Sequence, residues 1–326
     1  PRYKEDYILA EASNIFMNAE TDFVMQGTSE LLDDENSRNP LTIMKLYASV
    51  VLIHADNNRF EEAEKLLKQA EKLAEKVRHY RVYALYYNLL SDYYDILLNG
   101  AYDTEEPEEE LLLNKMLDAI DKSLRYSKRG RTYDGDHIYA NNILAKATVL
   151  MRSGRGTEKE ISKLIDTAQT LVIENTSKYA DVRLHYYLVC AWYFALMHNS
   201  ASSTESFVND ARELADIITP TDLEKIETII IPCSNIYFEL RSYGRAIKLL
   251  FEGIQLCVAH ANTDAYARIK QGLCDHLWQV GIEAEAFEIC QNILFLIDCE
   301  NNAIVDPKNK VIVSDETRSI IANEKT

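Results

Sequence analysis

Two pairs of cysteine and histidine near the C-terminal end of the chain are residues of the type that binds zinc, and the members of each pair lie close in the sequence. Cys257 and His260 lie three residues apart, and Cys274 and His276 lie two apart. Thiolate and imidazole are common zinc ligands. Residues two apart on a helix point away from each other, so Cys274 and His276 cannot easily share one ion. We therefore expect buried free thiols and ordinary polar histidines, with no metal and no other cofactor.

Motifs for catalysis are not recognisable in the sequence. It holds no Gly-rich phosphate loop, no GxSxG and no HExxH. The 52 acidic residues are spread so widely that carboxylate pairs carry no signal. We expect a protein that is not an enzyme. The alternative is a response-regulator phosphatase acting through residues 3–33, with Gln26 positioning a water molecule.

The composition favours long helices joined by short links. The 326 residues are 47% hydrophobic and include only 10 Gly and 6 Pro, fewer turn residues than sheets or barrels usually need. The net charge of −17 argues against nucleic acid and anionic membranes as partners and is compatible with a cationic partner. No apolar run has the length of a membrane span. Six cysteines without a CxxC pair indicate a reducing compartment, so we expect a cytoplasmic protein.

Residues 59–77, RFEEAEKLLKQAEKLAEKV, form the clearest amphipathic segment. Their apolar and small side chains recur at the period of one helix face, and the other face is Glu, Lys and Gln. The striped positions are Phe60, Ala63, Leu66, Leu67, Ala70, Leu73, Ala74 and Val77. Residues 40–58 are also helical in composition and end in a polar link, so the two segments predict an antiparallel helix hairpin.

The hairpin pattern recurs along the chain. Residues 241–256 align with 59–77, so that Tyr243 corresponds to Phe60 and Ala246 to Ala63. In residues 241–256, Gly253 also corresponds to Ala70. Further second helices are expected at residues 111–126, 160–173, 206–218 and 281–296, and the first three have small residues at Ser123, Ala168 and Ala211. Expected first helices are residues 86–98, 141–151, 186–196 and 232–240, with small residues at Ser91, Ala145, Cys190 and Ser234. Small residues let neighbouring helices approach closely.

This pattern of small and aromatic residues resembles the tetratricopeptide repeat family. The resemblance covers residues 41–298 and is clearest in 41–77 and 225–257. It implies an all-α fold, a right-handed superhelical array of about six antiparallel helix pairs. One feature departs from the family: corresponding small residues are 40 to 53 positions apart here, whereas the family repeats every ~34 residues. HEAT-type repeats, whose period is longer, are the structural alternative.

The repeats divide the chain into three regions. We expect an N-terminal helical segment at 1–39, the array at 40–298 and a tail with a short helix at 299–326. An acidic insertion at 99–110 is interpreted as a solvated loop entering a helix N-terminus, where carboxylates are favoured. A docking site for a basic partner is the alternative. Because the sequence begins with Pro1 rather than Met, we expect a piece of a longer protein.

The resemblance also implies a binding surface on the concave face, which the first helices line. The positions that correspond to ligand-contacting residues are Lys45, Asn88, Asp92, Asp95, Asn142, Lys146, Tyr187, Asn235, Glu239, Gln271 and Asp275. Asn and Gln side chains donate to and accept from a peptide backbone, and the carboxylates favour Lys or Arg on a ligand. The alternative is that these residues only form the solvated face of each helix.

We therefore expect a scaffold or sensor module that binds a protein or an extended, basic peptide within a larger bacterial signalling or regulatory protein. The alternatives are a peptide-pheromone regulator, a response-regulator phosphatase built on the same repeats, and self-association into a homo-oligomer. A carboxylate clamp for chaperone tails is disfavoured, because Lys45 and Lys146 are the only cations at these positions.

Overall fold

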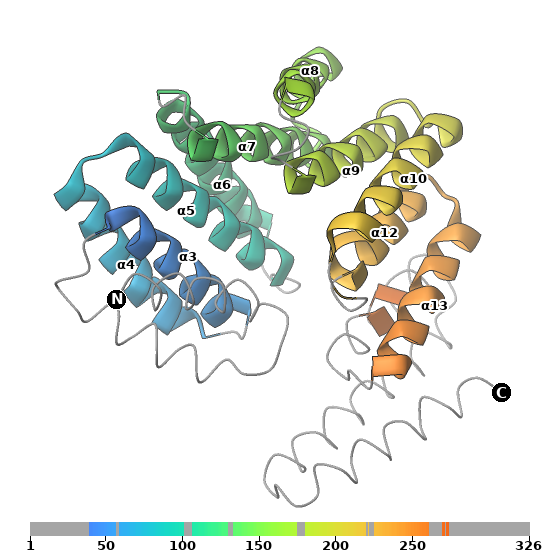
Figure 1. Ribbon diagram of the computed structural model, residues 1–326, viewed down its shortest axis with the longest axis horizontal. Helices are drawn as coiled ribbons and strands as arrows, with labels where there is room; N and C mark the ends of the chain where they lie inside the picture. Colours follow the sequence, from blue (N-terminus) through green and yellow to red (C-terminus); the bar gives the residue numbers. More distant parts are fainter. Residues whose placement is uncertain are drawn as a thin grey trace, which may run out of the picture. The chain divides into compact units, whose positions relative to one another are not determined.

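The computed structural model describes residues 39–56, 59–100, 106–129, 133–174, 180–219, 221, 225–260, 269–270 and 272–273. All regular structure in these residues is helical, which confirms the all-α prediction (Figure 1). The chain divides into two compact units, Pro1–Tyr186 and Tyr187–Thr326. The tail predicted at 299–326 and, except for Asn39, the segment predicted at 1–39 lie outside the described residues.

Helices of the first unit pair as hairpins. The pairs are α3 (Pro40–Asp56) with α4 (Phe60–Val77), α5 (Tyr80–Gly100) with α6 (Glu106–Ser127), and α7 (Tyr133–Arg152) with α8 (Glu158–Glu174). α5 also contacts α3 and α7, so the first helix of each pair packs against the first helix of the next (Figure 1). The hairpin predicted for residues 40–77 is confirmed, and both of its helices end within the predicted segments.

The small residues of α4 are the reason it packs so closely. Ala63, Ala70 and Ala74 are fully buried, as the sequence stripe predicts, and they join a core that includes Met44 of α3 and Leu89 of α5. Alanine side chains allow neighbouring backbones to approach while still removing apolar surface from water. The Glu and Lys side chains of the opposite face are exposed.

Serine is also small enough to let two helices pack closely, and its hydroxyl can donate to a backbone carbonyl of the neighbouring helix. Ser123 of α6 is fully buried, and its hydroxyl donates to the Ala84 carbonyl of α5 over 2.8 Å. Ser91 and Ala168 are buried as predicted. Ala145 is different, because it is only half-buried and lines a groove.

The acidic insertion is shorter than its sequence suggests. α5 continues to Gly100 and α6 begins at Glu106, so residues 99–100 and 106–110 of the predicted loop belong to helices. Glu109 and Glu110 are exposed near the N-terminal end of α6, where the helix dipole favours negative charge. Residues 101–105 lie outside the described part of the chain.

The second unit begins within α9 (Ala180–Leu196) and continues through α10 (Ala201–Ile218), the π-helix η1 (Ile226–Ile230), α12 (Ile231–Glu239) and α13 (Tyr243–His260). α12 packs on α13, and both contact η1. Gly253 of α13 lies where a Cβ atom would come within 2.6 Å of Ile269 Cδ1. The small residue predicted at this position is therefore confirmed. Among the described residues, none of the helices has the length and hydrophobicity needed to span a bilayer.

Candidate functional site

A groove of about 620 Å³ opens on the first unit, where α3, α5, α7 and the start of α9 contribute side chains. We name it the polar groove. It is lined by Lys45, Leu85, Asn88, Ser91, Asp92, His137, Ile138, Asn141, Ala145, Asp181 and His185. Lys45, Asn88 and Asp92 were all predicted for the binding face, and the packing of α3 on α5 brings them to one groove.

A chain of short hydrogen bonds positions Asp92. Asn142 Nδ2 donates to Asn88 Oδ1 and to the Ile138 carbonyl, each over 2.8 Å. Asn88 Nδ2 in turn donates to Asp92 Oδ2 over 2.8 Å. Asn142 is only 1% exposed, so it joins α7 to α5 from within the protein, whereas Asn88 and Asp92 line the groove. Asn142 is therefore a positioning residue for the Asp92 carboxylate.

The Asp92 carboxyl titrates near neutral pH. Burial raises its pKa to about 7, and the neighbouring Asp95 adds to the rise, while a hydrogen bond from Ser91 opposes it. Removing a carboxylate from water disfavours its charged form. Because the same carboxyl lines the groove, a cation bound there would favour the ionised form and release a proton.

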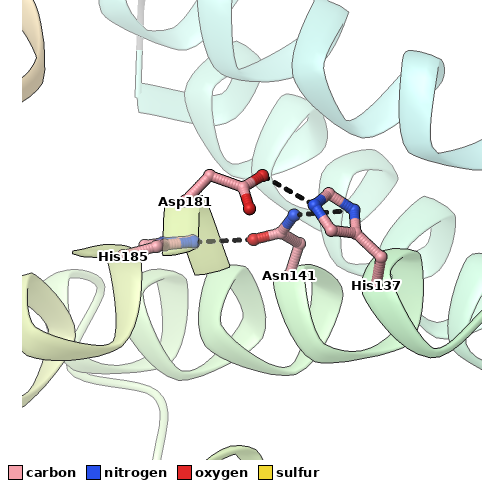
Figure 2. A network of polar contacts seen from close by, with 4 residues as sticks. All are labelled: His137, Asn141, Asp181 and His185. Atoms are coloured by element: carbon pink, nitrogen blue, oxygen red, sulfur yellow. Dashed lines mark hydrogen bonds and ion pairs between the residues drawn. The ribbon is translucent and has the colours of Figure 1, made fainter. Parts of the chain in front are cut away.

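A second polar network crosses from α7 to α9 (Figure 2). His137 Nε2 lies 2.6 Å from Asp181 Oδ2, Asn141 Nδ2 lies 3.5 Å from His137 Nδ1, and His185 Nδ1 lies 3.3 Å from Asn141 Oδ1. His137 and Asn141 are four residues apart on α7, as Asp181 and His185 are on α9. This spacing puts both members of each pair on one helix face.

The ionised carboxylate of Asp181 determines which atoms donate in this network. Burial works to raise the pKa of Asp181, but the hydrogen bond and charge of His137 bring it below its ordinary value. An ionised carboxylate only accepts, so His137 Nε2 donates to Asp181 Oδ2. Asn141 Oδ1 then accepts from His185 Nδ1. Burial lowers the pKa of His185 to about 4, so this ring is neutral at pH 7 and its Nε2 is an acceptor.

The remaining predicted residues lie in other surroundings. Lys146 Nζ lies 2.8 Å from Asp121 Oδ1 of α6 and does not line the polar groove. Asp95 is half-buried beside Asp92. In the second unit, the Tyr187 ring centroid lies 6.4 Å from that of Phe207, and on α12 Asn235 is half-buried and Glu239 exposed. Gln271 and Asp275 lie outside the described residues.

The cysteine and histidine pairs are only partly described. Cys257 is buried, whereas the His260 side chain, Cys274 and His276 lie outside the described part of the chain. In the part that is described, no three His, Cys, Asp or Glu side chains gather in an arrangement that could hold a metal ion.

The network of His137, Asn141, Asp181 and His185 was missed at the sequence level. The helices expected there were residues 141–151 and 186–196, which begin after three of these four residues. α7 and α9 begin earlier, at Tyr133 and Ala180. A signal was present: histidine recurs four residues from a polar partner in both segments, as HxxxN at 137–141 and DxxxH at 181–185.

The sequence matches no protein-family model, and no curated protein matches it.

Proposed function

We propose that the polar groove binds an extended peptide segment of a partner protein, and that a Lys or Arg side chain of this segment contacts Asp92. The proposal includes a tetratricopeptide-type array as its scaffold. The proposed array is supported by the succession of helix hairpins, in which α3 packs on α5 and α5 packs on α7. First helices in contact give a ligand one continuous row of side chains to bind.

Asn141 is the residue best suited to contact the peptide backbone. Its hydrogen bonds to His137 and His185 are long, at 3.5 and 3.3 Å. A peptide amide can replace such bonds at little cost, because a side-chain amide both donates and accepts. Asn88 differs, since both of its bonds are 2.8 Å long and hold it in place.

The observation that carries the proposal is the carboxylate of Asp92, which the Asn142 and Asn88 amides hold in the groove. Charge-assisted hydrogen bonds are stronger than neutral ones, and a carboxylate that is already positioned loses little entropy when a cation binds. Lys45 is exposed at the α3 side of the groove and has no ion-pair partner among the described residues, so it can contact a peptide carbonyl or an acidic side chain.

The experiment is a fluorescence anisotropy titration with a labelled peptide that alternates Lys and Ala. Asp92→Asn keeps the shape of the side chain but removes its charge, and it should weaken binding about tenfold or more. Asp166→Asn is the matched control, because Asp166 is exposed on α8 and lines none of the grooves described here. Equal weakening by both variants would mean that the peptide binds only through the net negative charge of the protein, and the proposal would fail.

Asn141→Ala supplies a second arm of the same titration. It should weaken binding by about threefold to tenfold, the loss expected for neutral hydrogen bonds. The variant should keep the melting temperature of the unmodified protein, because the bonds it removes are long. An unchanged affinity would exclude Asn141 as the backbone contact.

A further inference from the structure

A second groove of the first unit, of about 480 Å³, runs over α7 between α6 and α8. We name it the basic groove. It is lined by Asp121, Leu124, Arg125, Lys128, Tyr139, Ile143, Glu160, Lys163, Leu164 and Thr167. None of these residues lines the polar groove. α7 turns Ile138, Asn141 and Ala145 to the polar groove and Tyr139 and Ile143 to the basic one.

The charges of the basic groove are unusual for this chain. Arg125, Lys128 and Lys163 are exposed and form no ion pair with the described residues. Asp121 and Glu160 are the acidic side chains of the lining, and Asp121 is neutralised by Lys146 at 2.8 Å. The groove therefore carries a cationic excess on a chain whose net charge is −17. Clustered cations of this kind attract an acidic partner.

The floor of the basic groove is apolar. Leu124 of α6 and Leu164 of α8 are half-buried, and Ile143 of α7 lies below them at 2% exposure. The cations stand on both walls, with Arg125 and Lys128 on or just after α6 and Lys163 on α8. A single phosphate needs donors that converge on one point, whereas these cations belong to two walls of a groove that is also lined by leucine and isoleucine.

We propose that the basic groove is a docking site for an acidic amphipathic segment of a partner protein. Its carboxylates pair with Arg125, Lys128 and Lys163, and its apolar side chains cover Leu124 and Leu164. Complementary charge accelerates the encounter and sets the orientation, and the apolar contact adds affinity. This site is independent of the polar groove and does not rest on the function proposed for it.

The test is binding of a labelled peptide with the repeat Glu-Glu-Leu, measured by fluorescence anisotropy on the full chain. The triple variant Arg125→Glu, Lys128→Glu, Lys163→Glu should weaken binding about tenfold or more. The matched control reverses three exposed lysines of α4 that line neither groove, Lys65, Lys72 and Lys76. This control should change the affinity by no more than about twofold. Equal loss in both triple variants would overturn the proposal, as would failure of the unmodified chain to bind.

Two further peptides test the chemistry of the occupant. A Glu-Glu-Ala repeat should bind about fivefold or more weakly than Glu-Glu-Leu, because it lacks the apolar contact. Equal affinity would overturn the amphipathic part of the proposal. A phosphoserine peptide without leucine that binds more tightly than Glu-Glu-Leu would overturn it in favour of a phosphate site. If the triple variant does not fold, Lys163→Gln replaces it, with a weakening of about threefold expected and no change taken as contradiction.

Discussion

The polar groove and the basic groove lie on different faces of the same helix, α7, and they hold their charges in different ways. In the polar groove the functional side chains are bonded to one another, through Asn142, Asn88 and Asp92 on one side and His185, Asn141, His137 and Asp181 on the other. In the basic groove Arg125, Lys128 and Lys163 are exposed and carry no ion pair within the described chain. The polar groove holds its charged and polar side chains in hydrogen bonds, and the basic groove offers exposed charge over an apolar floor.

This difference predicts different sensitivities for the two sites. A partly buried, hydrogen-bonded carboxylate is poorly screened by salt, but its protonation depends on burial and on its neighbours. Exposed lysine and arginine side chains stay charged at neutral pH, and their attraction for a partner is screened at ordinary ionic strength. The polar groove should therefore respond to pH, and the basic groove to salt.

The largest expected effect is the loss of stability when the buried amide of Asn142 is removed. Asn142→Ala leaves Asn88 Oδ1 without its donor and removes the side-chain hydrogen bond to the Ile138 carbonyl, at a cost of about 1–3 kcal/mol. Lys146→Ala, one helical turn along α7, breaks only the partly exposed pair with Asp121 and should cost less than about 1 kcal/mol. Urea unfolding of both variants measures the difference. Equal costs would show that the Asn142 bonds do not organise the polar groove.

A somewhat smaller effect is expected from Asp92→Asn at alkaline pH. The pKa of Asp92 is about 7 in the folded protein, against an ordinary value of 3.8. The folded protein therefore binds more protons than the unfolded chain between these values, and the contribution of Asp92 to stability falls as pH rises through this window. Asp92→Asn should raise stability by about 1–2 kcal/mol at pH 8.

At a pH of about 3 and below, the Asp92 carboxyl is mostly protonated in both states, so the gain from Asp92→Asn should disappear there. Urea unfolding at both pH values measures this, with Asp166→Asn as the control that should show no such dependence. A gain that is the same at both pH values would assign the effect to packing instead of charge.

The next effect is the pH dependence of peptide binding. Between pH 6 and 8 the Asp92 carboxyl passes from mostly neutral to mostly ionised, so affinity for the Lys-Ala peptide should rise about tenfold. His185, whose pKa is about 4, stays neutral throughout and does not contribute. The same titration with Asp92→Asn should lose most of this rise. A rise that persists in the variant would point to another titrating group in the groove.

The smallest expected effect is the difference in salt response between the two grooves. Raising salt from about 50 mM to about 500 mM should weaken the Glu-Glu-Leu peptide about fivefold and the Lys-Ala peptide about twofold. Anisotropy titrations at the two salt concentrations measure the ratio. The reverse order would mean that the two sites do not differ as their geometry indicates.

Local periodicity was sufficient to predict most of the described helices and their buried faces, although α7 and α9 begin earlier than expected. The helix expected at 281–296 lies outside the described residues. Ala63, Ala70, Ser123 and Gly253 were all placed at helix contacts by their spacing alone, because a helix face repeats every three to four residues wherever the partner lies. The same reasoning correctly paired the segments 40–58 and 59–77.

The polar groove could be predicted less completely than the helices, because it depends on the rotation of each helix about its axis and on long-range packing. Asn142 was expected to face a ligand on the assumption that Ala145 lies at the helix contact. In the structure Ala145 lines the groove and Asn142 is buried, so the residue at this level of the groove is Asn141. Neighbouring residues on a helix point about 100° apart, so an error of one position exchanges a buried and an exposed side chain. The His137 and Asp181 pair joins residues 44 positions apart, beyond the reach of any local pattern.

The most direct test of the account is a backbone amide NMR titration of the chain with the Lys-Ala peptide at pH 8. We expect the largest shift changes at Asn88, Asp92, Asn141 and His185, and little change at Leu124 and Lys163. Asp92→Asn should reduce the changes at the first group. Shift changes spread evenly over the acidic surface, or centred on the basic groove, would contradict the assignment of the polar groove as the peptide site.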